Sequence, residues 1–232
     1  MTRTLDKIVH HLHEANALQN VINQSPLQSK LVDVQKWQCH RLIDTHQPFW
    51  EDKRYSPAMQ FFVNELYGPQ DFSQRDEELA RVVPKMSTLL PEKALASLET
   101  ALHLNTMSLA LDWKLTQHLG EQTINRDTYA HAYRACNNEK DRLLQLQFIA
   151  ELGLALQEVI KVPGISTLLT LSKRPAKAAG VLTLHRFLHE GYRSFKKLGN
   201  VKDFIGPVLA KEHAIMEHLF HETTNPLPEV AF

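Results

Sequence analysis

Residues 144–160 read LQLQFIAELGLALQEVI. Apolar side chains in this stretch fall on more than one face of a helix of 3.6 residues per turn, a pattern typical of a helix covered by neighbours on several sides. The helical pattern extends over about 139–161, and Val162-Pro163-Gly164 ends it. We therefore predict a central, well-buried helix around which the rest of the chain packs.

Helical signals continue on both sides of this stretch. The chain of 232 residues has only 8 glycines, and Leu, Ala, Glu, Lys and Gln, which are good helix formers, dominate it. We find no convincing strand with a period of two residues and no repeat of fixed length. The sequence predicts an all-α fold, a single compact multi-helix bundle of about ten helices. We expect one domain over residues 1–225 and an extended C-terminal tail over 226–232.

Three local expectations depend on glycine and proline. A short helix begins at Ser56-Pro57, and Tyr67-Gly68-Pro69 ends it. One helix is expected over residues 175–198. The last helix is expected to be interrupted at Gly206-Pro207 and to continue to about residue 221.

The charge balance gives no reason to expect nucleic acid as a partner. The chain has 26 basic and 26 acidic residues, although basic side chains gather between Lys161 and Lys202. That region is interpreted either as solvated helix faces or as a patch for an anionic partner.

The expected location is the cytoplasm. The N-terminal sequence has no apolar core of a signal peptide, and no stretch approaches 18 uninterrupted apolar residues, so we expect no membrane segment. The two cysteines, Cys39 and Cys136, lie in helical patterns without a CxxC motif, and they are expected to be small buried thiols.

No catalytic motif emerges. The sequence contains no GxSxG, no GxxxxGK[ST] and no GxGxxG, which are the patterns of common nucleophile and phosphate sites. No cofactor is predicted, and the sequence favours a protein that is not an enzyme.

Histidine offers a candidate for metal binding, because the chain has 13 of them. His213, Glu217 and His221 follow one another at four-residue spacing, which places three potential ligands on one helix face. No Glu-x-x-His pair of the di-iron bundles accompanies them. The alternative is that these histidines are solvated or lie at helix ends.

Polar residues on apolar helix faces give a second candidate site. Asp112 lies on the apolar stripe of the helix expected from Pro91, with Trp113 beside it. Tyr133 and Arg134 lie on a later helix. A buried carboxylate needs a partner, and arginine is the best one. The pattern indicates either an internal ion pair or hydrogen bond, or the lining of a pocket.

Residues 61–86, FFVNELYGPQDFSQRDEELARVVPKM, resemble the signature of an uncharacterised bacterial family, the FFLEELY motif proteins. Val63 and Asn64 depart mildly from the Leu-Glu of that motif. The resemblance implies a bacterial cytoplasmic protein and supplies no activity. Arg75 is expected to pair with Glu65 or Asp71, or else to form part of the wall of a site or partner surface.

From these observations, the leading hypothesis is a non-enzymatic module for protein interaction or regulation. The apolar tail supports it, since Pro226–Phe232 could dock on a neighbouring subunit. The alternative is a helical bundle that binds a small molecule or metal, either as an enzyme or as a binding protein.

Overall fold

The computed structural model describes residues 2–69, 73–86, 92–222 and 224–230, and within these ranges it contains helices and no strand. The helices in chain order are α1 (Thr2–Asn23), α2 (Gln28–Thr45), α3 (Gln47–Glu51), α4 (Ser56–Phe61), the π-helix η1 (Phe62–Tyr67), α5 (Ser73–Met86), α6 (Glu92–Leu119), α7 (Arg126–Ala135), α8 (Glu139–Lys161), α9 (Ile165–Leu171), α10 (Lys173–Ala178), α11 (Leu182–Lys196) and α12 (Lys202–His221). The all-α bundle predicted from the sequence is confirmed.

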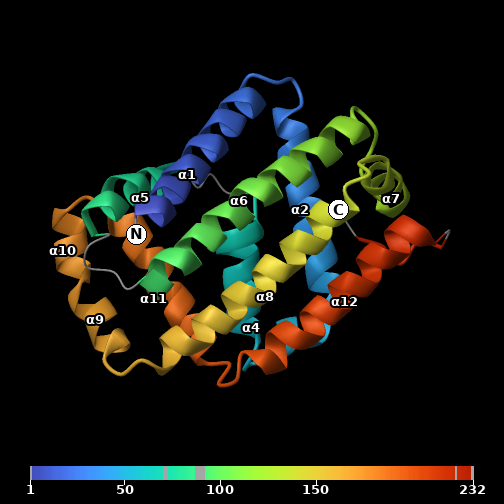
Figure 1. Cartoon of the computed structure of the whole chain (residues 1–232). Coiled ribbons are helices and arrows are strands. Elements are labelled where there is room, and N and C mark those ends of the chain that lie inside the picture. The colour runs from blue at the N-terminus through green and yellow to red at the C-terminus, as the bar shows by residue number, and fades with distance from the viewer. Residues whose placement is uncertain (1, 70–72, 87–91, 223, 231–232) are drawn as a thin grey trace.

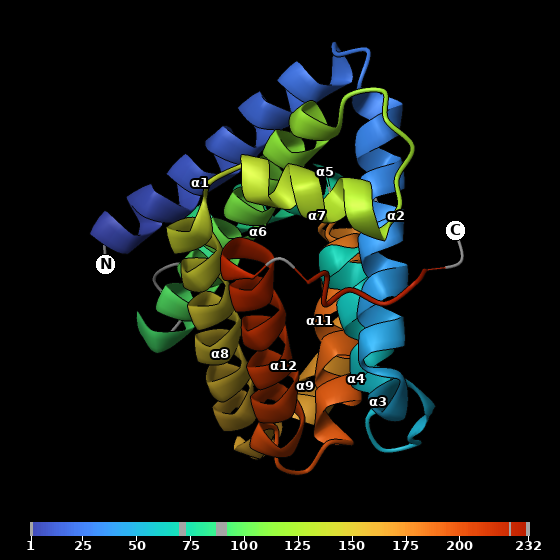
Figure 2. The ribbon, with the colours of Figure 1, turned by 90° about the vertical axis from the view of Figure 1, so that its right-hand side faces the viewer.

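The helices form two layers. In the first, α1, α6, α8 and α12 lie side by side, each packed on the next (Figure 1). In the second, α2, α4, α5 and α11 lie behind them, and α7 crosses one end of the molecule (Figure 2). This arrangement places apolar faces of both layers opposite each other.

Two aromatic clusters hold the layers together. In one, Trp37 of α2 stacks on Tyr129 of α7, with ring centroids 4.4 Å apart, beside buried residues of α6 and α12. In the other, Phe61 of α4 meets Phe195 of α11 edge to face at 6.0 Å, beside buried residues of α12. These aromatic side chains contribute large buried areas, so the clusters fix how the two layers meet.

The start of α7 shows how local sequence determines a helix boundary. The side chain of Asn125 accepts hydrogen bonds from the backbone N–H groups of Asp127 and Thr128, both at 2.9 Å. The Thr128 hydroxyl accepts one from the Asn125 N–H at 3.0 Å. This capping box satisfies N–H groups that have no partner within the helix, and such caps contribute about 1 kcal/mol.

Two predicted boundaries differ from the structure. The helix expected over 175–198 is divided into α10 and α11 by a turn at Gly180, whose φ of 67° is left-handed. The last helix, in contrast, is continuous through Pro207. We attribute its continuity to the burial of side chains on both sides of the proline, such as Phe204 and Ile215, which offsets the lost backbone hydrogen bond.

The helix expected at the centre of the bundle is not well buried. Its buried residues are Arg142, Gln145 and Gly153, while Leu154 and Val159 are exposed. α8 packs against α6 and α12, so it does occupy the middle of a layer. Of its other apolar side chains, Leu146, Leu156 and Ile160 are only partly buried and pack at the edge of core clusters.

Candidate functional site

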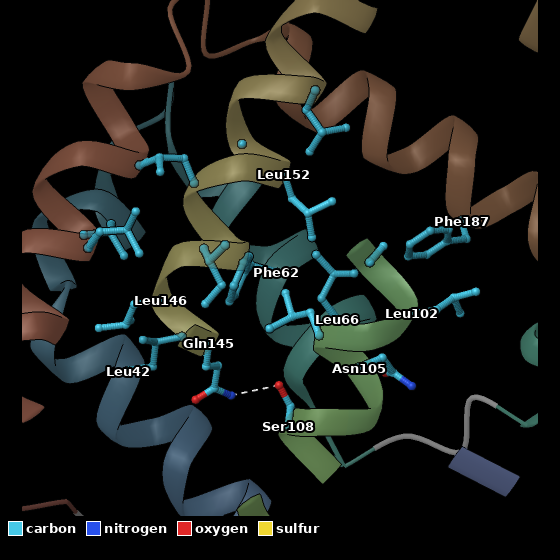
Figure 3. A pocket seen from close by; sticks show the side chains of 18 of the residues that line it. Leu42, Phe62, Leu66, Leu102, Asn105, Ser108, Gln145, Leu146, Leu152 and Phe187 are labelled. Atoms are coloured by element: carbon cyan, nitrogen blue, oxygen red, sulfur yellow. Dashed lines mark hydrogen bonds between the residues drawn. The ribbon is translucent and has the colours of Figure 1, made fainter. Parts of the chain in front are cut away.

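A pocket of about 450 Å³ lies between the two helix layers. Its volume falls within the roughly 300–1,000 Å³ typical of sites for small molecules. Side chains from most of the long helices line it, and Figure 3 shows 18 of them. The labelled apolar members are Leu42, Phe62, Leu66, Leu102, Leu146, Leu152 and Phe187.

The pocket explains the incomplete burial of one face of α8, whereas the exposed Leu154 and Val159 lie outside its lining. Leu146, Ile149, Leu152 and Leu156, at helical spacing on one face of α8, line the cavity. A fully packed interior leaves few voids larger than a water molecule. The apolar stripe therefore faces a space that this chain does not fill, and an apolar molecule would complete its packing.

One end of the pocket carries uncharged polar groups. Gln145 Nε2 donates to Ser108 Oγ at 2.8 Å (Figure 3), and Gln145 Oε1 accepts from Arg142 Nη1 at 3.3 Å. The amide of Asn105 also lines the pocket. Amide and hydroxyl groups of this kind orient a ligand by hydrogen bonds rather than by charge.

The ionic groups in the pocket wall already have partners within the chain. Arg41 Nη1 donates to Oε1 of Glu212 at 2.6 Å, and Arg75 Nη2 lies 3.0 Å from Oδ1 of Asp76. Arg142 lies over the ring of Tyr133 at 4.8 Å. Arg41 and Arg75 thus each face a carboxylate, whereas Arg142 faces an aromatic ring, so the lining carries three arginines and two carboxylates.

The segment Phe62–Tyr67 reaches the pocket as a π-helix rather than as the α-helix expected from the sequence. Phe62 and Leu66 line the cavity from this turn. π-Helices are rare and occur frequently at functional sites. The turn ends at Gly68, where a Cβ atom would overlap the carbonyl oxygen of Val63. Only glycine permits this close approach, so the residue helps to place the two pocket side chains.

Of the five residues selected from the sequence as a candidate site, some line the pocket and others do not. Arg75 and Tyr133 line the pocket, whereas Asp112, Trp113 and Arg134 are not among its lining residues. Trp113 packs in a separate apolar cluster with Ile22. Arg134 Nη1 points to the backbone oxygen of Leu219 at 3.4 Å.

Asp112 forms an internal hydrogen bond, which was one of the two interpretations of the sequence. Gln38 Nε2 donates to its Oδ1 at 3.1 Å, and Gln35 Nε2 lies 3.5 Å from Oδ2. Burial raises the pKa of this carboxyl group, against the opposing effects of Arg142 and the glutamine amides. The group connects α6 to α2 inside the core.

The contacts of Arg75 show which of its expected partners in residues 61–86 it meets. Its Nη1 donates to the backbone oxygen of Glu65 at 3.2 Å, and its ion pair is with Asp76. Its guanidinium lies over the ring of Phe187 at 5.0 Å. Asp71, the other partner considered, lies outside the described residues.

The histidine triplet selected as a metal candidate is not brought together. His213 and Glu217 approach to 3.6 Å, but both side chains are exposed. His221 instead contacts Glu139 of α8 at 2.8 Å. Within the described ranges, the group whose ligand atoms do lie within 4.8 Å of one another is His11, Glu99 and His103.

Both cysteines are buried thiols, as predicted. Burial, reinforced by the nearby Asp112 carboxylate, raises the pKa of the Cys39 thiol to about 12. The thiolate is the reactive form of cysteine, so Cys39 is not suited to nucleophilic chemistry at neutral pH.

Residues 17–226 match the family described as Domain of unknown function (DUF8198). The chain belongs to this family. No curated protein and no solved structure is detectably similar to the chain. The family match agrees with the expectation of an uncharacterised family.

Among the described residues, one helix, α8, has the length and apolar composition needed to cross a membrane. The core helix of a soluble protein meets the same criterion, so a single helix of this kind is weak evidence. In this structure part of the apolar character of α8 is explained by the pocket, because one face of the helix lines it.

Proposed function

We propose that the protein binds a long aliphatic molecule that carries a small uncharged polar group. The observation that carries the proposal is the apolar pocket between the helix layers, lined by the leucines of α8 and by the polar side chains of Asn105, Ser108 and Gln145. Of the two functions expected from the sequence, this is the helical bundle that binds a small molecule.

Apolar burial gives enough energy for such a complex. Each buried methylene group contributes about 0.8 kcal/mol, so a chain of about ten methylenes contributes ~8 kcal/mol. Association costs roughly 4–15 kcal/mol in lost freedom and desolvation. At the lower cost, ten methylenes leave about 4 kcal/mol, which corresponds to millimolar binding, and about five more methylenes are needed for micromolar binding.

The two ion pairs in the wall favour an alcohol, amide or ester over a carboxylate, because Arg41 and Arg75 already face carboxylates of this chain. A carboxylate entering the pocket would meet Glu212 and Asp76 as well as the arginines that pair with them. Removing an ionised group from water without a dedicated partner is costly. Uncharged groups can bond to Asn105 and the Gln145–Ser108 pair without that cost.

The direct test is displacement of the fluorescent probe N-phenylnaphthylamine by dodecanol and by dodecanoate. Dodecanol is expected to displace the probe at lower concentration than dodecanoate at pH 8. Displacement by neither would overturn the proposal. Tighter binding of dodecanoate would contradict the assignment of an uncharged head group.

A matched pair of variants ties binding to the pocket. Leu152→Trp fills the cavity from α8, whereas Leu154→Trp places the same ring at an exposed position two residues away. Leu152→Trp is expected to reduce probe binding at least tenfold, and Leu154→Trp to leave it unchanged. Equal affinity in both variants would locate the probe elsewhere.

Exposed leucines favour self-association as a second candidate function. Leu168 and Leu171 of α9 are 63% and 70% exposed, unusual for large apolar side chains in neighbouring helical positions. A second copy of the chain could cover them. Light scattering over a hundredfold concentration range tests this, and a monomer throughout would remove the candidate.

A further inference from the structure

We infer that His11, Glu99 and His103 form a binding site for a divalent transition-metal ion between α1 and α6. Each residue offers one ligand atom, and these atoms all lie within 4.8 Å of one another. Two imidazoles and a carboxylate are a common ligand set for zinc, which takes a water or substrate in its fourth position. The inference does not depend on the proposed pocket ligand.

The positions of the ligands follow from how the two helices pack. Glu99 and His103 are four residues apart on α6, so they share one face. α1 packs along α6 and supplies His11, whose side chain is nearly buried. The packing of α1 on α6 thus brings together three ligand side chains that neither helix carries alone.

The two ring nitrogens of His11 are both engaged by carboxylates. Nδ1 lies 3.2 Å from Glu14 Oε2, and Nε2 lies 3.3 Å from Glu99 Oε1. A metal-bound histidine commonly donates its second ring N–H to a carboxylate, which fixes the tautomer and ring orientation. With the Nδ1 proton held by Glu14, the Nε2 lone pair of His11 is directed at the space shared with Glu99.

His103 completes the group. Its ring stacks on that of His11, with centroids 4.5 Å apart and planes inclined by 11°. Burial lowers its pKa, and His11 adds to this effect, while Glu99 and Glu14 oppose it. The neutral imidazole, which is the form that binds metal, is therefore favoured near pH 7.

Metal binding requires a small closure of the site. Ligands about 2.0–2.1 Å from zinc in a tetrahedron lie about 3.3 Å apart, so the most distant ligand atoms must approach by rotation of side chains. Lys7 lies 3.7 Å from Glu99 and is half exposed, so it can move into solvent. The loss of this surface ion pair costs little.

The competing explanation is a purely structural network in which protonated His11 bridges Glu14 and Glu99. The two explanations respond differently to added metal ion. A metal site binds its ion, and does so more tightly as pH rises, because protons compete for the imidazoles. A network that only joins His11 to Glu14 and Glu99 needs no ion, so added Zn²⁺ would not stabilise it.

The experiment titrates chelator-treated protein with Zn²⁺ by calorimetry and follows the melting temperature in parallel. The wild type is expected to bind one Zn²⁺ with micromolar or tighter affinity and to melt at higher temperature when loaded. His103→Gln should weaken binding at least tenfold, and Glu14→Gln about tenfold or more, since loss of an outer partner typically costs 10–100-fold.

His213→Gln is the matched control, because His213 and Glu217 form an exposed histidine–carboxylate pair on another helix. It should leave the high-affinity site unchanged, and so should Leu152→Trp in the pocket. Circular dichroism verifies that each variant is folded. Zn²⁺ binding that is absent, or that survives unchanged in a His11→Gln, His103→Gln double variant, would overturn the inference.

Discussion

Arg41 and Glu212 lie 171 residues apart in the chain, yet one guanidinium nitrogen donates to both carboxylate oxygens, at 2.6 and 2.7 Å. His46 Nε2 adds a contact of 2.8 Å to Oε1. Burial raises the pKa of Glu212, but Arg41 and His46 outweigh it and hold the pKa at about 2. This pair joins α2 to α12 at the wall of the pocket.

The pair should make stability depend on acid pH. The folded-state pKa of Glu212 lies below its ordinary value of 4.5, so its contribution is fully present above that pH and is lost as pH falls towards 2. We expect Glu212→Gln to lower the free energy of unfolding by roughly 3 kcal/mol at pH 7. Urea denaturation between pH 2 and 7 measures this. A difference from wild type of the same size at pH 2.5 and pH 7 would contradict the prediction.

Asp112 should behave in the opposite way. Its folded-state pKa is raised above 3.8, so the ionised form destabilises the fold as pH rises above that value. Asp112→Asn keeps an acceptor for the Gln38 amide, and it should be as stable as wild type or more stable at pH 7. Asp112→Ala removes one of the two acceptors of the buried Gln38 amide, the other being the Tyr129 hydroxyl, and should cost about 1–3 kcal/mol. Thermal melts of both variants decide between these outcomes.

Gly191 permits the close packing of α11 on α4. A Cβ atom at this position would lie 2.8 Å from Cζ of Phe61, so Gly191→Ala should displace that ring and destabilise the protein by about 1–3 kcal/mol. Gly206→Ala in α12 meets nothing within 4 Å, and it should stabilise by roughly 0.5–1 kcal/mol through helix propensity. Chemical denaturation compares the two. A stabilising effect of Gly191→Ala would show that the Phe61 ring can move aside without a cost in stability.

The C-terminal segment contributes to the core of its own chain. Leu227 is 3% exposed and packs with the aromatic cluster around Trp37. Leu227→Ala should therefore lower the free energy of unfolding by about 2–5 kcal/mol, while the mass in solution stays the same. Light scattering and denaturation together test this. A change of mass with unchanged stability would indicate that the tail contacts a second copy.

Part of the candidate site was visible in the sequence. Arg75 and Tyr133 were selected because polar or aromatic residues stood at informative positions, and both line the pocket. The leucines of α8 were missed because they resembled core residues. The available signal was the apolar character of α8 on more than one face, which a pocket and a packed neighbour explain equally well.

By itself, the sequence determined the all-α class and most helix boundaries. Helical periodicity, caps such as Asn125 and breaks such as Val162-Pro163-Gly164 act over a few residues. They can therefore be recognised in the sequence without knowledge of the tertiary structure. Tertiary structure alone decided that Leu152 faces a cavity, that Arg41 meets Glu212, and that His11 meets Glu99. These relationships depend on which helices become neighbours and how far apart they lie. The same apolar stripe can satisfy several helix pairings, and only the packing of the whole chain selects one.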